Sequence, residues 1–165
     1  MKIHIVLDSV RDKNLKQMKQ LNAAIFPVKY KDKFYSDCIA CGDVTQLAYY
    51  NDILVGAIAC RLESKGEGKA KLYIMTLGVL APYRDLGVGT HLLEHSLRVA
   101  REDPNIEEAY LHVQTNNDGA IRFYGKHGFS IKEMIPNYYK RIDPPDCYIL
   151  HKNLVVAVEG TDGAE

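Results

Sequence analysis

The feature that most constrains the fold of this chain is the change of hydrophobic pattern around Pro82. Lys71–Leu80 is an apolar run of strand length, whereas the residues after Gly87 follow a helical period. One arc of about 140° on that helical run contains Leu92, Leu93, Ser96, Leu97 and Ala100. A strand that turns through a glycine-containing loop into an amphipathic helix is therefore predicted over 71–101.

Similar patterns predict the remaining elements. Strands are expected over 3–7, 45–50, 53–63, 71–80, 108–114, 129–135 and 147–154. Helices are expected over 14–22, 32–42, 87–101 and 117–127. Asn51-Asp52 suits a two-residue turn, and the segment 64–69 is expected to separate two strands of an antiparallel meander. The order indicates an α/β fold, an α+β mixed sheet of about seven strands flanked by about four helices.

Composition limits the function classes. The 165 residues are 47% hydrophobic, enough for one core, and Lys plus Arg (21) balance Asp plus Glu (21) at a pI near 7.0. Direct binding to nucleic acid or to a membrane is therefore not expected, because both partners attract basic surfaces. Without an apolar run of membrane-spanning length or a signal peptide, a soluble cytoplasmic protein is predicted, with the nucleus left open as a second compartment.

Cysteine and histidine spacing predicts no metal site. Cys38 and Cys41 form a C-x-x-C pair, but no second pair follows at the spacing of a zinc ribbon. Cys60 and Cys147 lie in apolar runs, so reduced thiols are expected for all four cysteines.

The loop from Arg84 to Thr90 predicts an anion site. A helix N-terminus presents unpaired N–H groups, and Gly87 and Gly89 let a phosphate approach the backbone. The loop lacks the G-K-S/T of a P-loop and the third glycine of the dinucleotide fingerprint. A diphosphate is therefore the expected ligand, and an ordinary strand-to-helix turn is the alternative.

Two motifs resemble one family. The R-x-x-G-x-G pattern of Arg84, Gly87 and Gly89 resembles the acetyl-CoA diphosphate loop of the GCN5-related N-acetyltransferase (GNAT) superfamily. The block from Asn117 to Phe129, N-x-x-A-I-x-F-Y-x-x-x-G-F, resembles the superfamily's pantetheine-lining helix and strand. Shorter matches at 26–28, 72–78, 111–114 and 137–139 resemble the catalytic subunits of NatE-type N-terminal acetyltransferases. The resemblance implies one GNAT-like acetyltransferase domain over 1–154, and a disordered tail is expected over 155–165.

The resemblance also implies two sets of binding residues. Acetyl-CoA is expected at Leu77, Gly78, Val79, Arg84, Asp85, Leu86, Gly87, Val88, Gly89, Thr90, Asn117, Ala120, Tyr124 and Lys126. The peptide substrate is expected at Phe26, Pro27, Val28, Tyr30, Met75, Tyr138, Tyr139, Lys140, Arg141 and Ile142. For Tyr138 and Tyr139, simple hairpin packing is an equally weighted alternative.

Three residues are the candidates for catalysis. If their strands pair as the family implies, Tyr73 and His112 meet on one face of the sheet. His112 is expected to be the general base, because neutral imidazole can accept the proton of an α-amine, and Tyr73 is expected to position the amine or a water. Tyr124 is expected to hydrogen-bond the departing thiolate. The alternatives are a structural histidine and two core tyrosines.

The resulting prediction is a protein N-alpha-acetyltransferase that acts on chains beginning with Met and a hydrophobic residue, with lysine side chains as secondary acceptors. The resemblance implies association with the auxiliary and catalytic subunits of NatA and with the ribosome. One alternative is a docked subunit that binds acetyl-CoA but is weakly active. Another is an enzyme for small-molecule amines, which the apolar Phe26, Met75 and Tyr138 do not favour.

Overall fold

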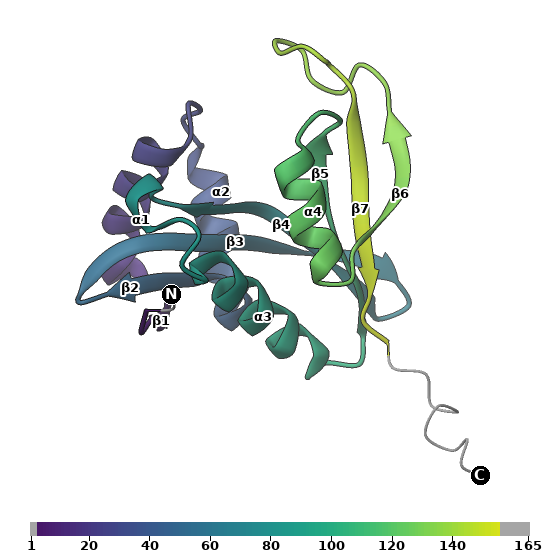
Figure 1. Ribbon diagram of the computed structural model, residues 1–165. Coiled ribbons are helices and arrows are strands. Elements are labelled where there is room, and N and C mark those ends of the chain that lie inside the picture. The colour runs from purple at the N-terminus through teal and green to yellow at the C-terminus, as the bar shows by residue number, and fades with distance from the viewer. Residues whose placement is uncertain (1–2, 156–165) are drawn as a thin grey trace. The chain divides into compact units, whose positions relative to one another are not determined.

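The computed structural model describes residues 3–155 (Figure 1). Its helices are α1 (Asp12–Ile25), α2 (Asp32–Ala40), α3 (Val88–Arg101) and α4 (Asp118–Lys126), with 3-10 turns η1 (Gly42–Val44) and η2 (Ala81–Tyr83). Its strands are β1 (Val6–Ser9), β2 (Gln46–Tyr50), β3 (Ile53–Gly66), β4 (Lys69–Val79), β5 (Ile106–Gln114), β6 (Ser130–Ile135) and β7 (Cys147–Asn153). None of the helices in this described part is long and apolar enough to cross a membrane.

The strands form a seven-stranded sheet in the order β1-β2-β3-β4-β5-β7-β6. The pair β4–β5 is parallel, whereas β1–β2, β2–β3, β5–β7 and β6–β7 are antiparallel. The predicted mixed sheet with four flanking helices is therefore confirmed.

Two predicted boundaries are wrong. The first strand is Val6–Ser9 rather than 3–7, and it pairs with β2 from Val6↔Tyr49 to Ser9↔Gln46. The segment 64–69 is not a separator, because β3 runs to Gly66 and β4 begins at Lys69. Only Glu67 and Gly68 turn the chain, both with positive φ (56° and 77°), as in the tightest hairpins. The expected disordered tail lies outside the described residues, apart from Val155.

Contacts divide the chain into two units, and β3 and β4 run through both. The first unit comprises the chain up to Leu62 together with Ile74–Asp103, and the second comprises Glu63–Tyr73 and the chain from Pro104 onward. The proposal of one domain over 1–154 stays a prediction.

In the first unit, helices pack on both faces of β3, because side chains alternate along a strand. Ala57 and Ala59 lie in the core with Met18 and Leu21 of α1. Gly56 faces the other way, and a Cβ there would lie 3.2 Å from Val88 of α3. Each fully buried aliphatic side chain contributes about 1.5–3 kcal/mol to stability, so these two layers account for much of the unit's stability.

In the second unit, β5 has one buried and one half-buried face. Ala109, Leu111 and Val113 are buried, whereas Tyr110 and His112 between them are half-buried. The half-buried face carries polar aromatic side chains. This alternation positions the site described below.

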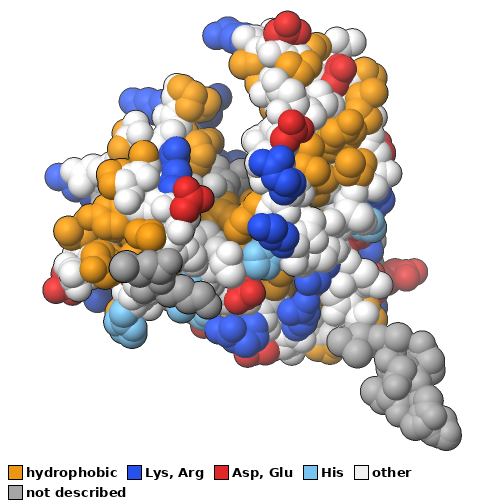
Figure 2. Space-filling model, in the orientation of Figure 1, with side chains coloured by type: hydrophobic (Ala, Val, Ile, Leu, Met, Phe, Trp, Pro, Cys, Tyr) orange, Lys and Arg blue, Asp and Glu red, His pale blue; other side chains and the backbone are white. Residues whose placement is uncertain are grey.

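The edge strand β6 is exposed along almost its whole length. Its pairing with β7 goes from Ile131↔Leu150 directly to Glu133↔Ile149, so Lys132 is an extra, bulged residue. Ile131 and Met134 are about half exposed, and Figure 2 shows hydrophobic side chains in this part of the second unit.

Candidate functional site

The centre of the candidate site is the pair Tyr73 and His112 in the second unit. Tyr73 on β4 pairs in parallel register with Tyr110 on β5, and His112 lies two residues further along the same face. The hydroxyl of Tyr73 lies 2.9 Å from Nδ1 of His112, a hydrogen bond between half-buried groups. The prediction that these two side chains meet is confirmed.

The protonation state of His112 favours proton acceptance. Burial lowers the pKa of His112, and the negative charge of Glu63 opposes this shift. The imidazole is therefore neutral near pH 7. When Nδ1–H donates to the Tyr73 oxygen, Nε2 carries the free lone pair. In the other tautomer the Tyr73 hydroxyl donates to Nδ1.

Tyr138 covers the His112 ring. The two rings are stacked, with centroids 4.6 Å apart and planes 14° from parallel. Tyr139 packs edge-on against Tyr138 at 5.0 Å. Tyr138 is thus held against the site, although its own side chain is 39% exposed, as expected of a residue that contacts a ligand.

The connection between β6 and β7 is tied to the end of β5, and these ties place Tyr138. Tyr139 N–H donates to the Pro145 carbonyl at 2.8 Å, and Gln114 Nε2 donates to the Pro144 carbonyl at 2.9 Å. Asn137, with φ of 58°, donates its N–H to the Asp146 carboxylate. Lys140, Arg141 and Ile142 lie in this connection and are exposed, so the structure gives them no partner in the site.

Tyr110 and Glu63 extend the site, and no motif in the sequence pointed to either. The Tyr110 ring stacks on Tyr73 with a centroid distance of 4.7 Å, and its hydroxyl donates to the Glu63 carboxylate at 2.5 Å. Glu63 is 47 residues away in sequence and reaches Tyr110 through the sheet. Only the alternation of Tyr110 with His112 could have indicated its presence on this face.

The residues predicted on α4 have structural roles of their own. Asn117 caps the helix, since its side-chain oxygen accepts from Ala120 N–H at 3.1 Å. Tyr124 is buried and packs edge-on against Phe129 at 5.4 Å. Lys126 is exposed. The structure shows the core-tyrosine packing weighed for Tyr124, and its role towards the thiolate stays a prediction.

In the first unit, the loop before α3 is shaped for an anion. Asp85 and Gly87 have positive φ (65° and 88°), and α3 begins directly after them at Val88. A Cβ built on Gly87 meets no described atom within 4 Å, so space is open beside the backbone. A helix leaves its first N–H groups, here those of Val88 and Gly89, without an intrahelical acceptor. These residues fit a diphosphate.

Neighbouring residues shape this loop. Arg84 Nε donates to the Val79 carbonyl at 3.0 Å, which anchors the loop to the end of β4. Gly78 serves packing, because a Cβ at this position would lie 2.7 Å from the Phe26 ring. Leu77 and Leu86 are half-buried beside these residues in the sequence.

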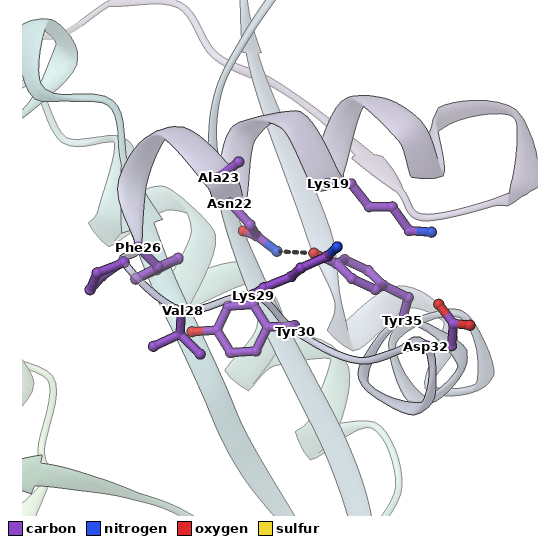
Figure 3. A pocket seen from close by; sticks show the side chains of 10 residues that line it. Lys19, Asn22, Ala23, Phe26, Val28, Lys29, Tyr30, Asp32 and Tyr35 are labelled. Carbon is purple, nitrogen blue, oxygen red and sulfur yellow. Dashed lines mark hydrogen bonds between the residues drawn. The ribbon is translucent and has the colours of Figure 1, made fainter. Parts of the chain in front are cut away.

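The predicted peptide loop lines a cavity of about 410 Å³ in the first unit (Figure 3). Phe26, Pro27, Val28 and Tyr30 form one part of its wall, and Lys19, Asn22 and Tyr35 form another. The Tyr30 ring stacks on Phe34 at 4.3 Å, which fixes the loop. Met75 packs on the adjacent core cluster instead of appearing in this wall.

The four cysteines of the chain are all free thiols. Burial raises the pKa of Cys38 to about 12, so its thiol is a poor nucleophile. Over residues 3–155, no group of three or more His, Cys, Asp and Glu side chains is arranged to hold a metal ion.

Comparison with known proteins now decides the family. The acetyltransferase (GNAT) family model matches residues 14–129. The chain belongs to this family. It is 51% identical over 154 residues to N-alpha-acetyltransferase 50 of Danio rerio, covering 93% of this chain and 91% of the relative. It is also 51% identical over 150 residues to the probable N-acetyltransferase san of Drosophila melanogaster, covering 91% and 81% of the two chains.

A solved GNAT structure gives the same result. Arabidopsis thaliana Naa50, in complex with the bisubstrate analogue CoA-Ac-MVNAL, is 58% identical, with a TM-score of 0.85 over 91% of this chain and 99% of that one. The expected enzyme class is confirmed: the chain is an N-alpha-acetyltransferase that uses acetyl-CoA.

Proposed function

We propose that this GNAT enzyme acetylates the α-amine of proteins that begin with Met followed by a hydrophobic residue, with His112 as the general base. The observation that carries the proposal is the Tyr73–His112 hydrogen bond beneath the exposed ring of Tyr138. It places a neutral imidazole, a phenol and a ligand-accessible aromatic ring together.

The base has a modest task. An α-amine with a pKa near 7.8 is about one-third neutral at pH 7.5, so much of the substrate is already able to attack. As nitrogen bonds to the acetyl carbon, one of its two protons becomes acidic, and His112 accepts it directly or through a water. The C–S bond breaks as the amide forms, and coenzyme A leaves as a thiolate that takes up a proton. In the tautomer whose Nδ1–H donates to Tyr73, this bond fixes the ring and leaves Nε2 to accept the proton.

Acetyl-CoA supplies the activated acetyl group as a thioester. We propose that the loop Arg84–Thr90 holds the diphosphate through the first-turn amides of α3. Gly87 provides the open space beside the backbone, and Arg84, anchored to Val79, adds a positive charge.

The substrate preference follows from the loop 26–30. Phe26, Pro27 and Val28 present apolar atoms, and Tyr30 is held by stacking on Phe34, while the charged groups of the same cavity wall are Lys19, Lys29 and Asp32. Such a surface favours a large apolar first residue such as a retained methionine. The bisubstrate analogue bound by Arabidopsis Naa50 carries a peptide beginning Met-Val, which supports the same preference.

Lysine side chains are proposed as secondary acceptors. With a pKa near 10.4, only about 0.1% of a lysine amine is neutral at pH 7.5, about 300-fold less than for an α-amine. Acetylation of lysine is therefore expected to be slower at the same site.

For partners and localisation, the proposal rests on the sequence resemblance to NatE catalytic subunits. It places the enzyme with the NatA auxiliary and catalytic subunits at the ribosome, in the cytoplasm and also in the nucleus. Co-purification of tagged protein with ribosomes before and after nuclease treatment tests this part.

The decisive experiment compares two peptides that differ only at their start, Met-Leu and Ser-Glu, with labelled acetyl-CoA. A hydrophobic pocket discriminates by about 10- to 200-fold, so Met-Leu is expected to lead in kcat/KM by that factor. His112→Ala is expected to abolish transfer while acetyl-CoA still binds. Equal rates for both peptides would overturn the proposed specificity. Tight acetyl-CoA binding without transfer to either peptide would support the weakly active subunit instead.

A further inference from the structure

The Tyr73–His112 pair has a second row of side chains beside it. Tyr110 lies next to Tyr73 on the neighbouring strand, with their rings 4.7 Å apart and 30° from parallel. The His112 ring meets both tyrosines edge-on, at 5.5 Å from Tyr73 and 5.9 Å from Tyr110. The orientation of the Tyr110 ring therefore limits the orientation of the two others.

Tyr110 is itself fixed at two points. Its hydroxyl donates to the Glu63 carboxylate at 2.5 Å, a charge-assisted hydrogen bond of the strong class. The ammonium group of Lys71 lies 4.8 Å from the ring centroid. Because the hydroxyl oxygen lies on the χ2 axis, the Glu63 bond fixes the position of the outer end of the ring. The face contacts with Lys71 and Tyr73 restrict rotation about χ2.

We propose that Glu63 and Tyr110 are positioning residues for catalysis: Glu63 fixes Tyr110, and Tyr110 holds the Tyr73 hydroxyl against His112. This positioning role of Glu63 and Tyr110 rests on the proposed function, in which His112 accepts the proton of the amine. Neither residue touches substrate in this role, and the proton remains on His112.

The charge of Glu63 also acts on the protonation of His112. The Glu63 carboxylate favours the charged form of His112, which burial disfavours. Other charged groups around this face include Lys71 on β4, Glu108 on β5, and His151 on β7, which pairs with Tyr110. Glu108 lies among Lys65, Lys132 and His151, whereas Glu63 is the carboxylate that acts on His112.

A purely structural reading is that the Glu63–Tyr110 bond only links β3 to β5. Three substitutions separate the two readings. Glu63→Gln keeps an acceptor for Tyr110 and removes the charge. Tyr110→Phe keeps the ring and removes the link. Glu63→Ala removes both.

We expect Glu63→Ala to lower kcat for the Met-Leu peptide by about ten- to a hundredfold, the range for a misplaced catalytic group, with KM nearly unchanged. Tyr110→Phe is expected to lower kcat by a smaller factor without moving the acid limb of the pH profile. Glu63→Gln is expected to move that limb to lower pH, because imidazolium loses a favourable charge. Tyr49→Phe is the matched control, since it removes a tyrosine hydrogen bond to Gln17 outside the site, and its kcat should not change.

A readout independent of turnover completes the test. The imidazole resonance of His112, assigned by its absence in His112→Ala, is titrated by NMR in wild type and in Glu63→Gln. A lower titration midpoint of His112 in Glu63→Gln than in wild type supports the proposed action of Glu63 on His112, even if the peptide specificity proves wrong. Unchanged kcat, pH profile and His112 titration in folded Glu63→Gln and Glu63→Ala would overturn the proposed role of Glu63 and Tyr110. Retained activity in His112→Ala would overturn the base assignment and leave the NMR result to decide the Glu63–His112 interaction.

Discussion

Each unit contains a chain of aromatic rings, and the two chains differ in their polar atoms. The loop cluster of the first unit (Phe26, Tyr30, Phe34, Tyr35) uses stacked and edge-on contacts, and Asn22 donates a buried hydrogen bond, 3.1 Å long, to the Tyr35 hydroxyl. The strand cluster of the second unit (Tyr73, Tyr110, His112, Tyr138) uses similar contacts, and it adds an imidazole and a carboxylate partner.

The comparison shows that both clusters use ring contacts to orient side chains, whereas the strand cluster also contains a proton acceptor. Ring contacts orient side chains in both clusters, and each aromatic pair adds about 0.5–1.5 kcal/mol beyond area burial. Only the strand cluster holds a group that titrates near neutral pH. Changes in the loop cluster should therefore alter stability and substrate fit, whereas changes in the strand cluster should alter the rate and its pH dependence.

The largest effect is expected from His112→Gln, which keeps a polar side chain in the strand cluster and removes the base. General-base catalysis typically contributes about 10²–10⁴-fold, so kcat should fall within that range. Peptide acetylation at saturating Met-Leu peptide measures it, and the melting temperature should change little.

The pH profile of the wild-type enzyme also tests His112 as the general base. Because burial lowers the pKa of His112, the neutral base persists to lower pH, and the limb of the kcat profile that belongs to His112 should lie below the ordinary histidine value of about 6.5. This limb should vanish in His112→Gln, whereas any limb from the α-amine of the peptide, near 7.8, should remain. A limb below 6.5 that persists in His112→Gln would contradict the assignment.

A medium effect is expected from Gly78→Ala, which acts on the loop cluster. The new methyl group would lie 2.7 Å from the Phe26 ring, so the loop must move. Overpacking of this kind costs about 1–3 kcal/mol of unfolding free energy. If Phe26 contacts the first residue of the substrate, KM for the Met-Leu peptide should rise by about threefold to tenfold.

Gly125→Ala is the matched control for this substitution. Gly125 lies in α4, and a Cβ there meets no described atom within 4 Å. It should be stabilising by up to about 1 kcal/mol, with unchanged KM. Equal destabilisation of both variants, measured by urea unfolding, would argue against the contact with Phe26.

The smallest catalytic effect is expected from Tyr35→Phe. The substitution leaves the buried Asn22 donor without its partner, which costs about 1–3 kcal/mol of stability. The pH profile and kcat should match the wild type. A shifted acid limb would show that the loop cluster also influences the base, and would remove the distinction between the two clusters.

The sequence alone predicted much of the fold because the periods are long and regular. The amphipathic run after Gly87 and the alternation in 108–114 both proved to be the elements expected, α3 and β5. The first strand was displaced because its bounds are set by pairing with Tyr49 and its neighbours, which local pattern does not encode. The tight turn at Glu67-Gly68 was hidden by four further polar and small residues around it.

The site was predictable where a motif carried it and not elsewhere. Tyr73 and His112 follow from strand alternation combined with the family resemblance, and their contact is confirmed. Glu63 could not be found in this way, since its contact with Tyr110 depends on strand neighbours far apart in sequence. Asn117 shows the opposite difficulty, because the same residue type that suits a ligand also suits a helix cap.

The bulge at Lys132 has a consequence for how this protein behaves at high concentration. An exposed edge strand is a template on which strands of other molecules can add, and β6 presents apolar Ile131 and Met134 along such an edge. The extra residue interrupts the regular spacing of edge N–H and C=O groups and brings a positive charge there. An incoming strand would therefore lose register after a few residues, which protects the enzyme from fibre-like self-association without the need to cover the strand.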